Sequence, residues 1–256
     1  MMGGIFFVII ALWAIVDARL GVDLSVATDE ATWDCLLDQG MDFAKVRAYH
    51  STGQLDTNAP ATITAASKAG MKDIDAYIFP CISTSPYSIE NNITCKSPTN
   101  QLLETLNYLA DNGIFFRHRQ DGVFLNRMWL DIEDESPSKY YDPNPATNQA
   151  YMAEITQAAK RLNLPMGIYT TKTYWSQIMD NVEDYSTTDR LGRYVYPLWY
   201  PRYDAVNSMD FFEPFGGWES VLIKQTGGDV GYCGVTQVDS DYMEDSGTSY
   251  YGIYPH

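Results

Sequence analysis

The strongest constraint on the fold of this chain is a regular alternation of short β-type segments with helical patterns over its first two thirds. A strand that connects to the next strand through a helix forms a βαβ unit, so the alternation predicts a parallel sheet. The expected strands are residues 20–26, 43–49, 72–79, 128–133 and 166–170. The helices expected after them begin near Asp29, Pro60, Leu102, Thr147 and Tyr174.

The pattern changes in the last third of the chain. Residues 194–200, 220–226 and 234–238 are typical of strands, but no long helical pattern separates them. Eight strands of this length favour closure into a barrel, and no Pro/Gly/Ser-rich linker divides the chain. We therefore expect one α/β domain, an irregular TIM-like barrel of about five βα units followed by three strands lacking long helices.

Two acids end the fourth expected strand, in the run Trp129-Leu130-Asp131-Ile132-Glu133. Alternate strand residues share a face, so Asp131 and Glu133 point the same way with Cβ atoms about 6.5–7 Å apart. Such a pair can divide into a protonated general acid and an ionised partner, which is what cleavage of a glycosidic bond needs. The alternative is an acidic strand end that continues into an acidic loop through Asp134 and Glu135.

Other acids and several aromatic residues also fall near expected strand ends, where α/β barrels carry their active sites. Asp23 lies in the first strand, Asp239 ends the eighth strand, and Asp241 lies just beyond it. The first and eighth strands are neighbours in a closed barrel, so these acids are expected to converge with Asp131 and Glu133. Candidates for substrate contact, with packing outside the barrel as the alternative, are Tyr77, Phe79, Tyr169, Trp199 and Tyr200.

The chain is acidic, with a net charge of -16 and a pI of about 4.4. This charge argues against nucleic acid as a partner. The three histidines, His50, His118 and His256, have no ligand spacing between them. We therefore expect no metal site and no cofactor.

The first 18 residues are typical of a secretory signal peptide. The apolar run from Ile5 to Val16 is too short to span a bilayer, and Val16-Asp17-Ala18 offers a cleavage site after Ala18. No second apolar run is long enough to cross a membrane. We expect residues 1–18 to be removed and residues 19–256 to form a single catalytic barrel domain without stable membrane association.

An even number of cysteines behind a signal segment favours disulfides over metal ligands. Cys81 and Cys95 enclose a polar loop, and pairing them leaves Cys35 with Cys233. The same loop contains Asn92, which begins an N-glycosylation sequon.

Six short segments are distributed along nearly the whole chain, and their order and spacing are specific. They are Gly21-Val22-Asp23-Leu24-Ser25, Leu130-Asp131-Ile132-Glu133, Gly167-Ile168-Tyr169-Thr170, Leu198-Trp199-Tyr200, Lys224-Gln225-Thr226 and Val238-Asp239-Ser240-Asp241. Together they resemble the Chalaropsis-type lysozymes of glycoside hydrolase family 25 and the Entamoeba-type branch found in animals and protists. The irregular barrel of that family also matches the expected order of elements.

The resemblance implies hydrolysis of the β-1,4 bond between N-acetylmuramic acid and N-acetylglucosamine in bacterial peptidoglycan. It implies that Glu133 is the general acid, that Asp131 tunes it and positions the substrate, and that Asp23 and Asp239 complete the acidic cluster. Tyr77 matches a strand-three tyrosine of the family. Ile78, however, stands where a histidine is often found, which affects the polar contacts on that side.

An acidic protein and an anionic cell wall repel each other at neutral pH. We therefore expect a secreted monomer that acts with an acidic pH optimum, in an acidic lysosomal, phagosomal or digestive compartment if not outside the cell. The sequence leaves open whether its role is feeding or antibacterial defence.

Two other functions compete with this interpretation. A chitinase-type enzyme of family 18 also uses a strand-four Asp-x-Glu, but its pattern requires an aspartate where this chain has Trp129. A non-enzymatic glycan-binding barrel would normally lack the acid that Glu133 provides. The carboxyl separation leaves retaining, inverting and substrate-assisted mechanisms open.

Overall fold

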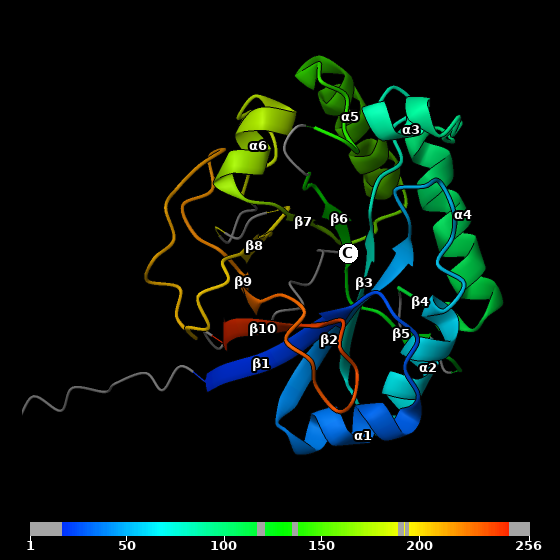
Figure 1. Cartoon of the computed structure of the whole chain (residues 1–256), viewed down its shortest axis with the longest axis vertical. Coiled ribbons are helices and arrows are strands. Elements are labelled where there is room, and N and C mark those ends of the chain that lie inside the picture. The colour runs from blue at the N-terminus through cyan, green and yellow to red at the C-terminus, as the bar shows by residue number, and fades with distance from the viewer. Residues whose placement is uncertain (1–16, 117–120, 135–137, 189–191, 193–194, 246–256) are drawn as a thin grey trace, which may run out of the picture.

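A closed barrel of eight strands is the centre of the computed structural model, which describes residues 17–116, 121–134, 138–188, 192 and 195–245. Its strands are β1 (Asp17–Leu24), β2 (Met41–Tyr49), β3 (Asp73–Ile78), β6 (Met128–Asp131), β7 (Met166–Tyr169), β8 (Leu198–Pro201), β9 (Ile223–Gly227) and β10 (Val238–Asp245). They follow the order β1-β10-β9-β8-β7-β6-β3-β2, so the last strand closes the ring against the first. The α/β barrel predicted from the sequence is confirmed (Figure 1).

Helices lie outside the barrel on the side of its first five strands, whereas loops cover the side of β8, β9 and β10 (Figure 1). The helices are α1 (Glu30–Asp38), α2 (Ala59–Ala69), α3 (Pro86–Glu90), α4 (Pro98–Asp111), α5 (Pro145–Arg161) and α6 (Lys172–Met179). Five of them match predicted helices, and α3 is an unpredicted helix inside the polar loop between Cys81 and Cys95. A separate two-stranded sheet consists of β4 (Ile114–Phe115) and β5 (Val123–Phe124).

Local sequence explains where these helices begin and end. The Asp29 side chain accepts the Thr32 N–H at 2.9 Å and caps α1, and α2, α3, α4 and α5 each have proline in the first turn. Gly70 ends α2 in the left-handed conformation with φ of 106°. These caps fix the short connections that return the chain to the barrel.

The strand β10 differs from the prediction in position and direction. It begins at Val238, where the predicted strand 234–238 ends, and it runs antiparallel to both β1 and β9. An antiparallel strand starts at the end of the barrel where its parallel neighbours finish. Asp239 therefore lies at the start of a strand rather than at its end, yet it still pairs with Asp23 near the carboxyl end of β1.

The barrel interior is filled rather than open. Two glycines make this possible, because a Cβ at Gly21 would lie 2.3 Å from the Phe43 ring and one at Gly167 would lie 2.3 Å from the Trp129 ring. A second apolar core lies between the strands and the surrounding helices. The apolar residues of the interior cluster are Phe43, Tyr77, Trp129, Tyr169, Trp199, Ile223 and Met243.

Two disulfides join the pairs predicted from the sequence. Cys35 in α1 is bonded to Cys233, with Cα atoms 5.9 Å apart, and Cys81 is bonded to Cys95, with Cα atoms 5.5 Å apart. Asn92 follows α3 as an exposed residue with φ of 52°. Its glycosylation stays a prediction.

Most of the predicted signal segment, residues 1–16, lies outside the described residues. The strand β1 begins at Asp17, and its first two residues, Asp17 and Ala18, pair with Asp245 and Glu244 of β10. Cleavage after Ala18 therefore remains a prediction. Across the described ranges, no helix has the length and apolar character needed to cross a membrane.

Candidate active site

Four carboxyl groups meet at one end of the barrel. Asp23, near the end of β1, lies opposite Asp239 on β10. Asp131 is the last residue of β6, and Glu133 follows it by two positions. The charges of these groups act on one another across the strands, since Asp239 raises the pKa of Asp23, of Asp131 and of Glu133. The structure thus brings together the acids that the sequence singles out.

Glu133 has the properties of an acid that keeps its proton near neutral pH. Burial, together with the charges of Asp239 and Asp134, raises the pKa of Glu133 to about 7, while a hydrogen bond with Tyr169 acts against this rise. Burial also raises the pKa of Asp239, to about 6, although the Asp229 N–H bound to its carboxylate opposes this change. Groups whose pKa lies near the working pH are suited to general acid catalysis.

Asp131 presents a vacant acceptor in the same cluster. Burial and the charge of Glu133 raise the pKa of Asp131 well above its ordinary value, while the Arg47 guanidinium lowers it. Its Oδ1 atom is buried and has no hydrogen-bond partner among the described residues. An unsatisfied buried acceptor costs about 1–3 kcal/mol, so this oxygen is a place where a donor group of a ligand would be stabilised.

Gln225 links the two ends of the cluster and was not predicted as a site residue. Its side-chain amide donates to Asp23 Oδ2 at 2.8 Å and to Asp239 Oδ2 at 3.0 Å. Its carbonyl oxygen accepts the hydroxyls of Tyr169 at 2.7 Å and Tyr203 at 2.9 Å. The only sequence signal was its inward position, between Lys224 and Thr226, in a segment that the family resemblance used without assigning a role.

Asp241, which was predicted as a substrate-binding residue, is part of the barrel interior. Its carboxylate accepts the Lys45 ammonium at 2.8 Å and the Trp199 indole N–H at 2.8 Å, and the residue is 2% exposed. Trp199 is likewise 2% exposed, and the Lys45 nitrogen lies 4.3 Å from the centre of its ring. These residues support the carboxyl cluster from within the barrel.

The other predicted aromatic residues divide between the two faces of the strands. Tyr77 and Tyr169 point into the barrel and pack edge-on against Trp199, with ring centres 6.2 Å and 4.4 Å away. The charges of Asp23 and Asp131 add to burial in raising the pKa of Tyr77 well above its usual value, so its hydroxyl lies close to the cluster.

Tyr200 and Phe79 lie away from the barrel interior. Tyr200 packs against Phe212 and Phe215 outside the strands, because neighbouring strand residues alternate in direction and Trp199 points inward. This packing favours the alternative stated for it, a role outside the barrel, and its contact with substrate stays a prediction. Phe79 follows β3 and packs against Tyr140, with ring centres 5.2 Å apart, beside the loop that continues from Glu133.

Asp134, which the sequence suggested only as part of an acidic loop, organises the chain after Glu133. Its buried carboxylate accepts the backbone N–H groups of Lys139, Tyr140 and Tyr141 and the Ser138 hydroxyl. Several N–H groups converging on one carboxylate hold a loop in a single conformation. These contacts hold residues 138–141 against Asp134, which directly follows the general-acid candidate.

Comparison with known proteins gives a consistent picture. A family model described as Lysozyme-like protein 1 matches residues 15–226. A probable GH family 25 lysozyme 5 of Dictyostelium discoideum is 30% identical, over 94% of this chain and 97% of the relative. Lysozyme-like protein 5 of Caenorhabditis elegans is 31% identical, over 93% of this chain and 98% of the relative.

Solved structures share the fold at lower identity. A family GH25 lysozyme from Aspergillus fumigatus has a TM-score of 0.62 and 18% identity, covering 89% of this chain and 94% of that one. A muramidase from Trichobolus zukalii has a TM-score of 0.59 and 23% identity, covering 87% of this chain and 92% of that one. At these identities the likeness concerns the barrel itself.

Proposed function

Since this chain belongs to the lysozymes of glycoside hydrolase family 25, we propose that it cleaves the β-1,4 bond between N-acetylmuramic acid and N-acetylglucosamine in peptidoglycan, with Glu133 as the general acid. The observation that carries the proposal is the convergence of the buried Glu133 carboxyl with three aspartates at one end of the barrel, which raises the pKa of Glu133 to about 7. Relatives named as lysozymes and muramidases support the substrate class.

The proposed reaction uses the proton that the buried Glu133 carboxyl retains. The Glu133 carboxyl donates its proton to the glycosidic oxygen, so that the N-acetylglucosamine unit leaves as an alcohol. Positive charge develops on the anomeric carbon of the N-acetylmuramic acid unit. Oxygen atoms of the neighbouring aspartates stabilise that charge in the buried site. A water molecule then adds to the anomeric carbon, and its proton passes to a carboxylate of the cluster, which completes the hydrolysis.

Asp131 is proposed to position the sugar. Its unpaired Oδ1 is a suitable acceptor for the N–H of an acetamido group, which every sugar of this polymer carries. Holding that group at a fixed place orients the anomeric carbon relative to Glu133.

The two disulfides indicate a protein that matures in an oxidising environment, outside the cell or in a lumen. We propose secretion through residues 1–18 and action in an acidic compartment. The net charge of -16 supports the second part, because protonation of carboxylates at low pH reduces repulsion from an anionic wall.

Digestion of purified peptidoglycan tests the proposal. The expected products carry N-acetylmuramic acid at their new reducing ends, which reduction with borohydride followed by mass spectrometry identifies. New reducing ends of N-acetylglucosamine, or cleavage of chitin in preference to peptidoglycan, would contradict the assigned bond.

A further inference from the structure

Tyr203 is an exposed aromatic residue held at the edge of the carboxyl cluster. Its side chain is 61% exposed, but its hydroxyl reaches inward and donates to Gln225 at 2.9 Å. Gln225 in turn donates to Asp23 and Asp239. One end of the Tyr203 ring is therefore fixed to the floor of the site, while the rest of the ring faces solvent.

The side-chain amide of Gln225 uses all of its hydrogen-bonding groups in these contacts. A side-chain amide has two N–H donors and one carbonyl oxygen with two lone pairs, and here the two aspartates and two tyrosine hydroxyls use all of them. The reverse orientation would turn the carbonyl oxygen toward two carboxylates. In this arrangement the Tyr203 hydroxyl donates its proton to Gln225 and still has a lone pair for a donor group of a ligand.

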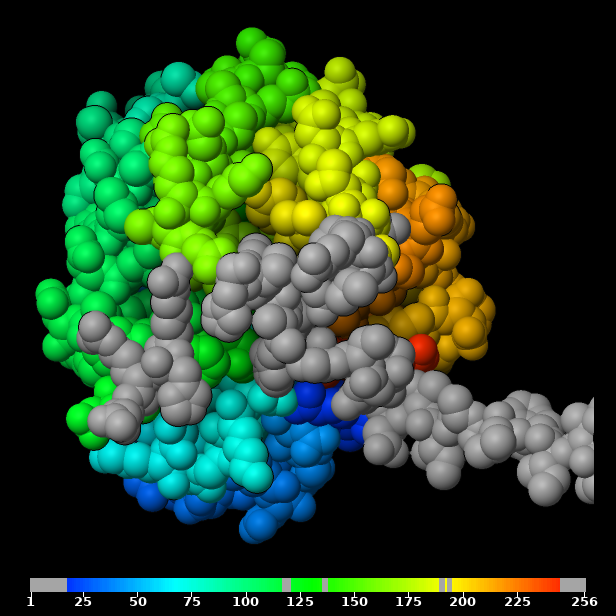
Figure 2. Space-filling view, turned by 180° about the vertical axis from the view of Figure 1, so that it is seen from behind, coloured from blue at the N-terminus to red at the C-terminus, as the bar shows by residue number. Residues whose placement is uncertain are grey.

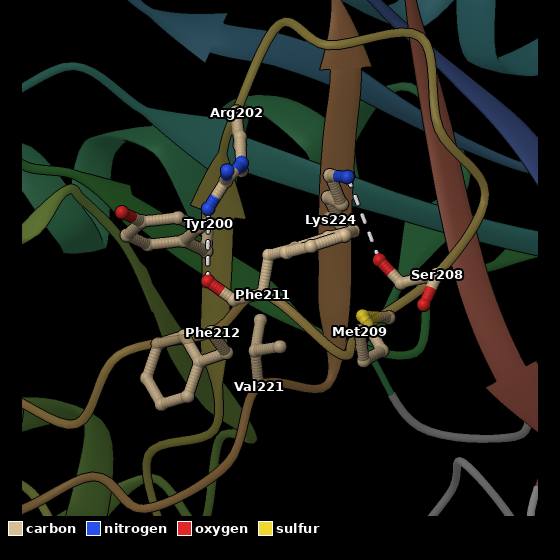
Figure 3. A pocket seen from close by; sticks show the side chains of 8 residues that line it. All are labelled: Tyr200, Arg202, Ser208, Met209, Phe211, Phe212, Val221 and Lys224. Atoms are coloured by element: carbon tan, nitrogen blue, oxygen red, sulfur yellow. Dashed lines mark hydrogen bonds between the residues drawn. The ribbon is translucent and has the colours of Figure 1, made fainter.

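The loop that carries Tyr203 is clamped from its other side. Lys224, whose side chain points away from the barrel, donates to Asp204 at 2.6 Å and to the Val206 carbonyl at 2.8 Å, and a longer contact reaches the Ser208 carbonyl at 3.4 Å. A small pocket lies beside this contact, and Figure 3 shows Lys224 and Ser208 facing each other among the residues that line it. Because Lys224 and Gln225 are consecutive in β9, one strand anchors both faces of the loop.

Backbone contacts complete the anchoring. The Arg202 N–H donates to the Gln225 carbonyl at 2.8 Å, and the Ala205 N–H donates to the Thr226 carbonyl at 3.0 Å. The Tyr203 ring also rests against the backbone at Gly228, where an added Cβ would lie 3.2 Å from the ring. An exposed ring fixed at both its base and its tip loses little conformational entropy when a ligand covers it.

From these contacts we propose that Tyr203 is a binding platform for a pyranose ring of the substrate, held beside Asp23 and Asp239 of the carboxyl cluster through Gln225. The negatively polarised face of an aromatic ring attracts the C–H groups on the flat side of a sugar. The hydroxyl lone pairs of Tyr203 then accept a sugar O–H or N–H at the inner end of the ring. The inference rests on the proposed function, since it takes a glycan as the ligand.

Position relative to the cluster supports this assignment. The charges of Glu133, Asp239 and Asp23 all contribute, after burial and against a hydrogen bond with Tyr169, to raising the pKa of Tyr203. A sugar stacked on this ring therefore lies beside the acids. The structure provides the matched control Phe211, an aromatic residue of the same long loop that is 54% exposed and packs on Arg202 instead.

Binding of a soluble peptidoglycan tetrasaccharide tests the platform without hydrolysis, by calorimetry in a Glu133→Gln background. Adding Tyr203→Ala is expected to weaken binding by about 3- to 10-fold, the size of one aromatic contact. Phe211→Ala is expected to leave the Kd unchanged, and Tyr203→Phe to bind more tightly than Tyr203→Ala. In the active enzyme, Tyr203→Ala should raise KM by more than it lowers kcat.

Two results would overturn the platform while leaving the proposed function intact: an unchanged Kd in Tyr203→Ala, or equal losses in Tyr203→Phe and Tyr203→Ala, which would assign the effect to the hydroxyl. A lower melting temperature with an unchanged KM would likewise reduce Tyr203 to a structural role. Failure of the Glu133→Gln parent to bind the tetrasaccharide would overturn the proposed function together with the platform.

Discussion

Glu133 has its unusual acidity because of residues on other segments of the chain. Asp239 on β10 and Asp134 in the following loop raise its pKa, and burial contributes most. Asp131, its neighbour in sequence, has its own pKa raised by the charge of Glu133. The general acid is thus a property of the assembled barrel end, since the Leu130-to-Glu133 segment alone would leave both carboxyls in water.

Replacing Glu133 by glutamine is expected to lower kcat by about 10²–10⁴-fold, because the amide keeps the shape but cannot donate a proton to the leaving group. The measurement is the release of reducing ends from peptidoglycan. Glu90→Gln, at an exposed glutamate that ends α3, is the matched control and should retain full activity. Turnover by Glu133→Gln close to that of the unmodified protein would remove Glu133 from the mechanism.

The acids of the site could be predicted from the sequence, but their polar partners could not. Asp131 and Glu133 are two residues apart at the end of an expected strand, and this spacing predicts that both carboxyl groups lie on one face. Gln225 and Tyr203 have no such signature, because amides and tyrosines are common and their roles depend on contacts between β8, β9 and β10. The burial of Asp241 was missed for the same reason, since Lys45, its partner, is 196 residues away in the chain.

A fully buried ion pair joins β2 and β10 of the barrel. Lys45 and Asp241 have fully buried side chains, and the Lys45 nitrogen lies between the rings of Phe43 and Trp199, at 4.5 Å and 4.3 Å. A buried charge without its partner is strongly unfavourable. The pair therefore makes the closing strand β10 dependent on β2.

Lys45→Met is expected to lower the free energy of unfolding by about 3–5 kcal/mol, because it leaves the Asp241 carboxylate buried without a counter-charge. Adding Asp241→Asn should recover much of that loss, since the amide keeps an acceptor for the Trp199 indole. Chemical denaturation of the three proteins measures both effects. Equal stability of the single variant and the unmodified protein would show that the interior tolerates an unpaired carboxylate.

The same interior explains why β10 was misplaced by sequence reasoning. Its residues 239, 241 and 243 point into the barrel, and two of these are aspartates, so the strand lacks the alternation of apolar residues that predicts a buried strand. Strands with apolar cores such as β2 and β7 were predicted within a few residues. A strand whose inward-facing residues are polar is difficult to predict from the alternation of apolar and polar residues.

The disulfides should differ in their effect on stability. Cys35 and Cys233 are separated by 198 residues, whereas Cys81 and Cys95 are separated by 14. In the chain-entropy model these loops correspond to about 5 and about 3 kcal/mol. Replacing Cys35 and Cys233 by alanine should therefore lower the melting temperature more than replacing Cys81 and Cys95, and the reverse order in calorimetry would contradict the model.

On the scale of the whole molecule, pH acts through the carboxyl cluster and through the net charge of -16. Burial raises the pKa of Glu133 from 4.5 to about 7 and that of Asp239 from 3.8 to about 6. The folded protein therefore keeps protons that the unfolded chain releases as the pH rises through this range. Stability must fall with rising pH wherever the folded state binds more protons.

We expect the melting temperature to be higher at about pH 5 than at about pH 8. Glu133→Gln should reduce this difference, because the glutamine does not titrate. Scanning calorimetry across the range measures both proteins. A melting temperature that rises between these values would show that the cluster does not retain its protons in the folded state.

The catalytic activity should decrease with rising pH as the protonated fraction of Glu133 decreases. With a Glu133 pKa of about 7, kcat/KM for a small uncharged glycan should drop as the pH rises through about 7, above the 4–5 region of ordinary carboxyls. On whole cell walls the decline should begin at lower pH, and added salt should reduce that extra decline. An unchanged kcat/KM up to about pH 9 would exclude Glu133 as the titrating acid.

The closing position of β10 also governs when a newly made chain acquires its chemistry. Asp239 and Gln225 come from the last two strands, while Asp23 comes from the first. A polypeptide still being synthesised has Asp131 and Glu133 long before it has the residues that hold Asp23 and raise the Glu133 pKa. Every fragment that stops before β10 therefore lacks a complete site, so the chemistry appears only once β10 has been made and has closed the barrel.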